Sequence, residues 1–263
     1  MGVPSFTFTF LGTGTSQGVP VIACDCEVCR STDPRDKRLR TAAHLQTDDL
    51  SIVIDTGPDF RQQMLREKVG RLDAVLFTHA HKDHVAGMDD IRSFYFRQKA
   101  PLELYGSSET FAQLRQEFAY VFGPTDYPGA PAIQTHLIQD QAFQIGELSI
   151  TPLPVMHRHM PVLGFRIGDF VYLTDCNYIP PETEAKLQGV KVLILNALRR
   201  QKHYSHFTLE EALAWVEKLQ PEAAYFTHLS HQMGKHADVS RELPAHVQIA
   251  YDGLKLHYQG DSL

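Results

Sequence analysis

Short apolar runs, separated by polar and glycine-rich segments, dominate the pattern of this 263-residue chain. Runs of four to eight residues that are apolar throughout, or apolar at every second position, are typical of β-strands. They predict strands at residues 6–11, 51–55, 72–78, 102–105, 148–153, 170–175, 192–195 and 223–227. Many of these runs stop at a polar residue or a histidine, which brings polar side chains to strand ends.

Segments with helical spacing of apolar residues lie between the strands. They predict helices at residues 85–96, 108–118, 181–188 and 208–219, the last with a capping box of Thr208 and Glu211. The segments VQIAY and LKLHYQ flank Asp252-Gly253 and predict a β-hairpin there. This interleaving of strands and helices, with strands also paired directly, predicts α/β layers built on mixed sheets.

The composition of the chain limits its size class and its possible partners. With 43% hydrophobic residues the chain can bury one substantial core, so we predict a single domain over residues 1–263. The net charge of −6 gives no general footprint for nucleic acid. No run of about 18 apolar residues occurs, and no secretory leader is evident at the N-terminus, so we expect a cytoplasmic protein without membrane contact.

The strongest chemical signal is the segment THAHKDH at residues 78–84, directly after a predicted strand. Imidazole and carboxylate groups are the expected ligands of zinc, manganese or iron. His79 and His81 can bind one ion, while Asp83 and His84 on the next turn can bind a second. A solvated polar turn is the alternative, but three histidines and a carboxylate within six residues favour metal.

HxHxDH after a buried strand resembles the signature of the metallo-β-lactamase superfamily. The resemblance implies an αβ/βα sandwich of two mixed β-sheets flanked by helices, with a dinuclear metal site at one edge. The other ligand positions match His157, His228 and Asp175, the last of which would bridge the ions. A lone histidine at a strand end is more often a hydrogen-bonding residue, but the order of these three favours ligands. His159 is an alternative to His157.

Three of the four cysteines crowd into ACDCEVC at residues 23–29. In a reducing compartment such thiols favour metal over disulfides, because neighbours in one turn pair badly. Taken alone the segment lacks a fourth ligand, and reactive or buried thiols remain alternatives. Cys176 stands apart and is expected to be a small buried residue.

Further motifs narrow the resemblance to one branch of the superfamily. FLGTGTSQGVP (10–20), the CxCxxC segment, IDTGPDFRQQ (54–63) and THLSH (227–231) resemble the phosphodiesterases of the bacterial carbon-phosphorus lyase pathway, which are akin to ribonuclease Z. A similar cysteine cluster occurs in a superfamily member linked to pyrroloquinoline quinone biosynthesis. The resemblance implies a structural zinc held by Cys24, Cys26, Cys29 and His231.

The resemblance also implies a reaction. A hydroxide bridging two divalent ions, zinc or manganese with iron also allowed, would attack the phosphorus of a small cyclic or nucleotide-like phosphodiester. The predicted catalytic residues are Asp83, which is also a ligand, and His206, which matches a histidine near the leaving group; His203 is the alternative. Asp55 is either a residue that orients a metal-bound histidine or a turn aspartate.

Two other functions stay open. One is ribonuclease Z-like RNA processing, which the acidic net charge and the absence of a basic, glycine-rich arm disfavour. The other is an accessory role in which the protein binds a small molecule in cofactor biosynthesis of the pyrroloquinoline quinone type. The expected partner is a small phosphodiester substrate rather than nucleic acid or a membrane, and the prediction allows a homodimer.

Overall fold

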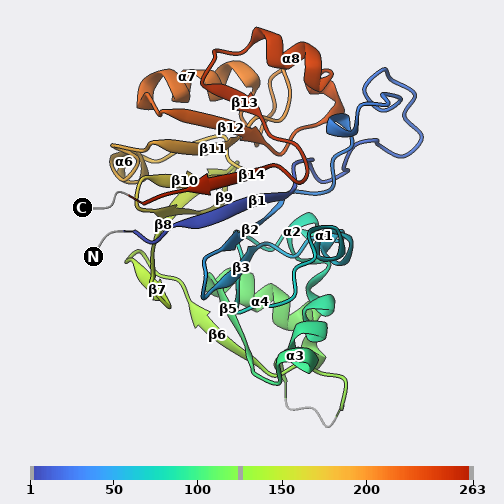
Figure 1. The fold of residues 1–263 in the computed structure, drawn as a ribbon, viewed down its shortest axis with the longest axis vertical. Coiled ribbons are helices and arrows are strands. Elements are labelled where there is room, and N and C mark those ends of the chain that lie inside the picture. Colours follow the sequence, from blue (N-terminus) through green and yellow to red (C-terminus); the bar gives the residue numbers. More distant parts are fainter. Residues whose placement is uncertain (1–2, 124–126, 261–263) are drawn as a thin grey trace.

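The computed structural model describes residues 3–123 and 127–260, and these form two seven-stranded sheets packed face to face with helices on their outer sides (Figure 1). In order across the first sheet are β14 (Lys255–Tyr258), β1 (Phe6–Gly12), β2 (Ala42–Gln46), β3 (Ser51–Ile54), β4 (Ala74–Leu76), β5 (Leu102–Gly106) and β6 (Ile133–Leu137). Across the second are β13 (Val247–Ile249), β12 (Ala223–Thr227), β11 (Val192–Asn196), β10 (Phe170–Tyr172), β9 (Met160–Ile167), β8 (Leu148–His157) and β7 (Phe143–Ile145).

Both sheets are mixed. Strands β14, β1, β2 and β3 pair antiparallel, and β3 to β6 continue in parallel. In the second sheet β13 to β10 run parallel, while β10, β9, β8 and β7 pair antiparallel. The predicted αβ/βα sandwich of two mixed sheets is therefore confirmed.

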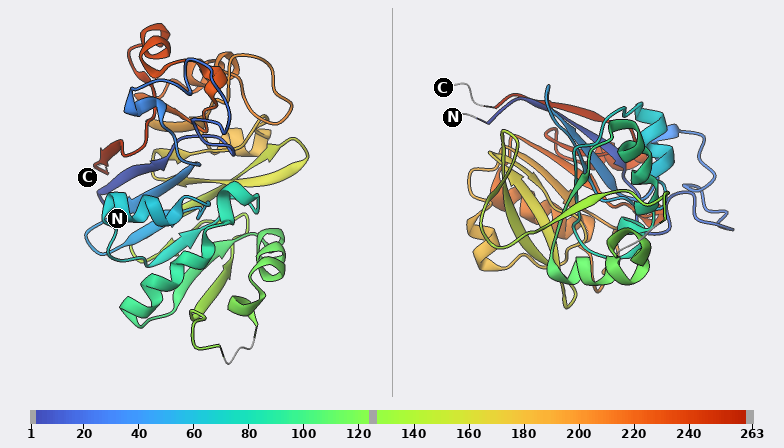
Figure 2. Two further views of the ribbon diagram at one scale, coloured as in Figure 1. Left: turned by 90° about the vertical axis from the view of Figure 1, so that its right-hand side faces the viewer. Right: turned by 90° about the horizontal axis from the view of Figure 1, so that it is seen from below.

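Helices cover the outer faces of the two sheets (Figures 1 and 2). Beside the first sheet lie α1 (Phe60–Glu67), α2 (Lys82–Val85), α3 (Arg92–Gln98), α4 (Ser108–Glu117) and α5 (Ala119–Phe122), with the 3₁₀ helix η2 (Met88–Ile91). Beside the second lie α6 (Pro181–Ala185), α7 (Leu209–Leu219) and α8 (His236–Glu242). The 3₁₀ helices η1 (Pro34–Asp36) and η3 (His231–Met233) lie in loops. In the described parts of the chain, no helix has both the length and the apolar character needed to cross a bilayer.

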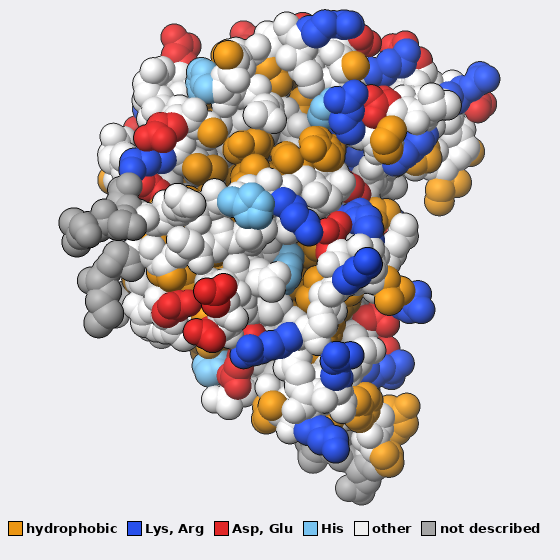
Figure 3. Space-filling model, viewed as in Figure 1, with side chains coloured by type: hydrophobic (Ala, Val, Ile, Leu, Met, Phe, Trp, Pro, Cys, Tyr) orange, Lys and Arg blue, Asp and Glu red, His pale blue; other side chains and the backbone are white. Residues whose placement is uncertain are grey.

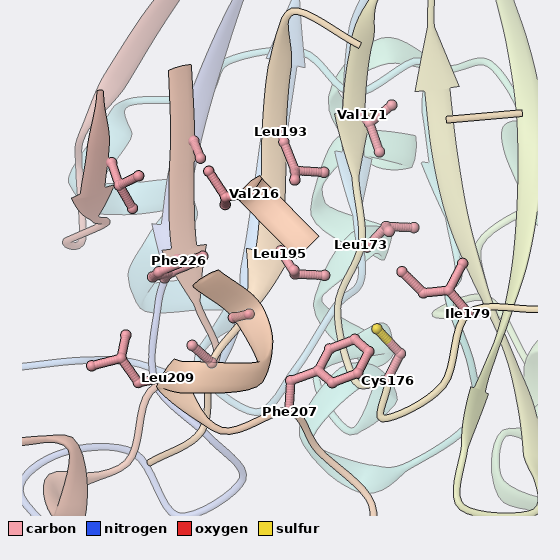
Figure 4. Close-up of a cluster of buried hydrophobic side chains, with 14 of the residues drawn as sticks. Val171, Leu173, Cys176, Ile179, Leu193, Leu195, Phe207, Leu209, Val216 and Phe226 are labelled. Atoms are coloured by element: carbon pink, nitrogen blue, oxygen red, sulfur yellow. The ribbon is translucent and has the colours of Figure 1, made fainter. Parts of the chain in front are cut away.

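The core has three layers of buried side chains. Between the sheets, Phe8 of β1 packs its ring 5.0 Å from Phe170 and 5.7 Å from Tyr172 of β10, measured between centroids. One outer layer lies between the first sheet and its helices. The other joins β10, β11 and β12 to α7 through residues such as Leu195 and Val216 (Figure 4). Phe6, Phe8 and Phe10 of the alternating FTFTF segment point into the layer between the two sheets.

All eight predicted strands are present, with shifted ends. Four further strands, β2, β6, β7 and β9, were not predicted from the pattern. The β6 segment is an only partly buried edge strand, so it lacks a clear apolar face. The β9 segment contains Pro161 and Gly164, which usually weaken a strand prediction.

The helix predicted at 85–96 is wrong as a single element, because the chain there forms α2, η2 and α3. The break lies at Gly87, whose N–H donates to the carbonyl of Thr56 at 2.8 Å. A Cβ atom at Gly87 would stand 2.1 Å from the carbonyl oxygen of Gly57, so the close approach requires glycine. The helices predicted at 108–118, 181–188 and 208–219 are present, the last with the Thr208–Glu211 capping box.

The hairpin predicted around Asp252 is also wrong. Strand β13 pairs with β12 in the second sheet, whereas β14 pairs with β1 in the first, so the turn between them crosses from one sheet to the other. The Asp252 carboxylate anchors the crossing, because it accepts hydrogen bonds from the backbone N–H groups of Thr13 and Leu39 at 2.9 and 2.8 Å.

Candidate metal centre

The histidines of the HxHxDH segment follow β4 and open α2. Thr78 precedes them, and both its N–H and its hydroxyl donate to the Asp55 carboxylate, at 2.8 and 2.7 Å. Asp55 lies at the end of β3 with a φ of 65°, a backbone conformation that non-glycine residues seldom adopt. Neighbouring parallel strands thus bring Asp55 and the histidine segment to one edge of the sheet.

Asp55 also fixes the orientation of His84. Nδ1 of His84 lies 2.7 Å from the Asp55 carboxylate, and both side chains are fully buried. This bond leaves Nε2 of His84 facing Asp83 and Asp175, at 3.3 and 3.2 Å. The structure therefore places Asp55 where a residue that orients a metal-bound histidine would lie.

Asp175 stands at the centre of the site. It follows β10 with a φ of 51°, and the hydroxyl of Thr174 donates to it at 2.6 Å. Besides His84, it faces Nδ1 of His228 at 3.1 Å and Nδ1 of His206 at 3.9 Å. Two groups of possible donor atoms share this carboxylate: Asp83, His84, Asp175 and His228 form one, and His157, Asp175 and His206 form the other.

His79 and His81 are predicted to bind one ion, and the ring of His157 lies beside theirs. Ring centroids are 4.7 Å apart for His79 and His81, and 5.1 Å apart for His81 and His157. Nδ1–H of His157 donates to the carbonyl oxygen of Ser205 at 2.9 Å, which leaves Nε2 toward the site. His159 is exposed on the same hairpin, so the geometry favours His157.

Unsatisfied ring nitrogens indicate what this arrangement can hold. Within the described residues, Nε2 of His79 and His84 and Nδ1 of His206 and His228 are buried without a hydrogen-bond partner. Buried polar atoms are rarely left without partners. Nitrogen lone pairs converging on shared carboxylates suit divalent metal ions, so the residues present fit the implied metal pair.

The carboxylates dominate the electrostatics of the site. Burial disfavours the protonated form of His84, but Asp175, Asp83 and Asp55 outweigh burial and raise its pKa well above the ordinary value. Burial alone would raise the pKa of Asp175, yet the nearby His228 and His84 lower it well below its usual range. Asp175 is therefore charged, as a bridging ligand requires.

The cysteine cluster forms a second, separate group of donors. The Sγ atoms of Cys24, Cys26 and Cys29 lie 3.3, 3.3 and 3.5 Å from Nδ1 of His231. In a tetrahedral site with metal–sulfur and metal–nitrogen bonds of about 2.3 and 2.0 Å, sulfur and nitrogen lie about 3.5 Å apart. These four side chains, the predicted set, thus fit one zinc ion, although they come from segments about 200 residues apart.

A pocket of about 390 Å³ opens over the metal centre. Its lining includes the predicted His203 and His206 and, from the FLGTGTSQGVP segment, Thr15 and Ser16. Residues that were not predicted also line it: Gln17, Arg199, Tyr204, Ser230 and Gln232. Tyr204 is 69% exposed, and the guanidinium of Arg158 lies 5.5 Å from its ring centroid. Gln17 and Ser230 lie inside motifs that indicate the branch of the superfamily but give these two residues no role. Arg199, Tyr204 and Gln232 lie outside the motifs, so the sequence pattern carried no signal for them.

Cys176 next to Asp175 plays no part in either donor group. Its thiol is fully buried among apolar side chains such as Ile179 and Phe207 (Figure 4), and burial raises its pKa well above the ordinary value. The prediction of a small buried residue is confirmed.

Residues 51–229 match the sequence family described as the β-lactamase superfamily domain. The match covers more than half of the chain and includes the HxHxDH segment, Asp175 and His228. The chain belongs to the metallo-β-lactamase superfamily.

Known members of the superfamily add detail. The chain is 40% identical over 248 residues to a protein named octanoyltransferase from Porphyromonas gingivalis, and 30% identical over 164 residues to a ribonuclease Z from Bradyrhizobium diazoefficiens. The matched regions cover 93% and 61% of this chain, but only 50% and 49% of those relatives, so the chain spans about half their length. It is also 30% identical to a coenzyme PQQ synthesis protein B from Rhodopseudomonas palustris, over 71% of each chain.

Solved structures resemble the chain over nearly its full length. A diphosphatase of the PhnP family superposes with a TM-score of 0.91 at 40% identity, covering 97% of this chain and 98% of that one. A zinc-bound PqqB from Methylobacterium extorquens, at 19% identity and a TM-score of 0.77, shares the fold. The predicted superfamily and its ribonuclease Z-related branch are confirmed, and a metal-binding hydrolase of this fold is supported.

Proposed function

We propose that this protein is a dinuclear metal-dependent phosphodiesterase that acts on a small cyclic or nucleotide-like phosphodiester. One observation carries the proposal: two groups of possible donor atoms, most of them buried, share the Asp175 carboxylate at the base of a small polar pocket. His79, His81 and His157 would hold one ion, Asp83, His84 and His228 the other, and Asp175 would bridge them. When bound, such an ion pair lowers the pKa of a water nucleophile and stabilises charge on phosphate oxygens.

The protein's own residues shape the rest of the reaction. Burial, followed by the nearby His228, lowers the pKa of His206 to about 2, so its ring is neutral. A neutral imidazole still has one N–H group that can donate a hydrogen bond to the oxygen of the leaving group. We therefore assign His206 the role of a neutral donor that stabilises developing charge, rather than that of an imidazolium. His203 lies 5.2 Å from His206 between ring centroids and stays the reserve candidate.

The pocket supports a small substrate. Its volume of about 390 Å³ is at the small end of ligand sites. On the face shown in Figure 3, basic side chains lie mainly toward the right, and acidic ones lie among them and at the left. The net charge of −6 gives no general attraction for RNA, which disfavours an RNA substrate. The full donor set disfavours a purely accessory, small-molecule-binding role, because such a role needs no cluster of buried histidines and carboxylates that can hold metal ions.

The name of the octanoyltransferase relative suggests acyl transfer as a competing reaction. Covalent acyl transfer often uses an activated cysteine or lysine. None of the described residues that line the pocket is a lysine or a cysteine. That relative is about twice as long as the matched region, so its name describes a larger protein.

Purified protein reconstituted with zinc or manganese would test the proposal. We expect turnover of bis(p-nitrophenyl) phosphate, cyclic ribose phosphates or 2′,3′-cyclic nucleotides, and none of a tRNA precursor or an octanoyl thioester. His206→Ala should lower kcat about 100-fold on the cyclic substrates, the size typical of a lost proton or charge stabiliser. His257→Ala, at an exposed histidine on β14, is the matched control. No phosphodiester turnover with either metal would refute the proposal.

A further inference from the structure

The loop between β11 and α7, residues 197–208, contributes His203, Tyr204 and His206 to the pocket; we call it the histidine loop. Its base is closed by hydrogen bonds from the N–H of Leu198 to the carbonyl of Phe207 at 2.9 Å and from the N–H of Leu209 to that of Arg199 at 3.0 Å. Further along, the carbonyl of Ser205 accepts the Nδ1–H bond of His157. A displacement of this loop would therefore disturb a predicted ligand as well as His206.

The ring of His206 depends on the same loop. Its centroid lies 4.5 Å from that of His157 and 4.8 Å from that of His228, so it is inserted between two predicted ligands. Ring packing and the path of the loop backbone hold it there, because Nδ1 of His206 has no hydrogen-bond partner among the described residues. The accuracy of this position must come from elsewhere in the loop.

The guanidinium of Arg199 supplies that constraint. It donates from Nε to the carbonyl of Gln201 at 3.2 Å, from Nη2 to the carbonyl of Lys202 at 2.9 Å, and from Nη1 to Oε1 of Gln232 at 2.7 Å. The first two bonds fold the tip of the histidine loop onto its own stem. Because the guanidinium is engaged on three sides, Arg199 is not placed as a free phosphate-binding cation, although it lines the pocket.

The third bond of Arg199 reaches toward the cysteine cluster. Gln232 follows His231 in η3, and Nδ1 of His231 is the nitrogen that faces the three cysteine sulfurs. The N–H of Ser230 donates to the carbonyl of Leu198 at 2.9 Å, which adds a backbone contact between the same two segments. The histidine loop and the cysteine cluster thus meet through Arg199 and Gln232.

We propose that Arg199 is a positioning residue that couples the cysteine cluster to the metal centre. Through Gln232 it fixes the histidine loop against the segment that a zinc ion on the cysteine cluster would hold, and the loop in turn fixes His206 and the carbonyl partner of His157. The catalytic consequence rests on the proposed function; the mechanical coupling does not.

Hydrogen exchange tests the coupling without any assay of turnover. In Arg199→Lys, a single ammonium cannot reproduce three planar bonds, so amides at 199–206 should exchange about tenfold faster than in the wild type. Gln232→Leu and Cys26→Ser should do the same, whereas Gln232→Glu keeps an acceptor and should retain protection. The control is Arg241→Lys, because Arg241 pairs with Asp238 within α8 and contacts neither the histidine loop nor η3 in the described contacts. Unchanged exchange in Arg199→Lys would overturn the coupling.

Leaving-group dependence tests the catalytic consequence. A poor alkoxide leaving group needs the N–H of His206 more than p-nitrophenolate does. Arg199→Lys should therefore lower kcat about tenfold more on a 2′,3′-cyclic nucleotide than on bis(p-nitrophenyl) phosphate, with little change in KM. Equal losses on both substrates would overturn the positioning role. A wild type inactive on every phosphodiester would refute the proposed function, while the exchange data would still decide the coupling.

Discussion

At the scale of single residues, the donors of the metal centre differ in how far apart they lie in the chain. His79, His81, Asp83 and His84 are contiguous, so their chemistry is visible in the sequence alone. His157, Asp175 and His228 required a family resemblance, because single residues at strand ends carry little signal. The carbonyl of Ser205, which orients His157, could not be predicted, since every residue has a carbonyl group.

A residue outside the metal centre gives a prediction about pH. His44 on β2 is buried, and its Nε2–H donates to the hydroxyl of Ser51 at 2.8 Å, which itself donates to the carbonyl of Arg71 at 2.6 Å. Burial lowers the pKa of His44 from 6.5 to about 4. Below pH 6.5 the unfolded chain therefore takes up a proton that the folded chain excludes, and stability falls as the pH drops from 6.5 to about 4.

The loss from His44 over this window amounts to about 3 kcal/mol. His44→Gln keeps a side-chain N–H donor but cannot titrate, so its unfolding free energy should fall less steeply, by up to about 1.4 kcal/mol per pH unit. Urea unfolding between pH 4.5 and 7.5 measures both slopes. His257→Gln, at an exposed histidine, should keep the wild-type slope. Identical slopes for His44→Gln and the wild type would contradict the assignment.

At the scale of elements, the pattern of apolar residues predicted the strands well. It failed where contacts between distant parts of the chain determine the structure. The 85–96 helix is broken by a hydrogen bond from Gly87 to Thr56, which no helical periodicity can reveal. The segments around Asp252 have the pattern of a hairpin, yet contacts with Thr13 and Leu39, more than 200 residues away, send the two strands to different sheets. The cysteine segment also depends on a distant contact, because its fourth donor, His231, lies near the other end of the chain.

The cysteine cluster yields a prediction at this scale. Cys26→Ser should lower the zinc content by about one ion per chain while the metals of the dinuclear centre are retained. Without that zinc, the segment 21–30 is no longer held to η3, and the melting temperature should fall, since binding energy at a structural zinc contributes to folding. Elemental analysis and calorimetry measure the two effects. Cys176→Ser, at a buried cysteine outside the cluster, is the control for zinc content.

Retention of the full zinc complement in Cys26→Ser would exclude a metal at the cluster. It would return the three thiols to the alternatives left open by the sequence, buried or reactive groups. The structure argues against the first of these, because Cys24 and Cys26 are only partly buried.

At the scale of the whole molecule, the two sheets depend on one another. Each contributes an inner face to the layer that contains Phe8, Phe170 and Tyr172. Exposing either apolar face to water would cost much of the free energy that stabilises the fold. Chain connectivity strengthens the dependence. The last strand, β14, returns to pair with β1, so the C-terminal half of the sequence completes the N-terminal sheet. The single domain predicted over residues 1–263 stays a prediction.

Cooperative unfolding tests that prediction. Phe8 belongs to the first sheet, whereas the lone tryptophan, Trp215, lies on α7 beside the second. If the two sheets unfold as one unit, Phe8→Ala should lower the free energy of unfolding by about 3–5 kcal/mol. Trp215 fluorescence and far-ultraviolet circular dichroism should report the same decrease. Phe96→Ala, at a half-exposed ring on α3, should shift neither signal much. Two separate transitions, with the fluorescence transition unmoved by Phe8→Ala, would instead show that each sheet unfolds with its own helices.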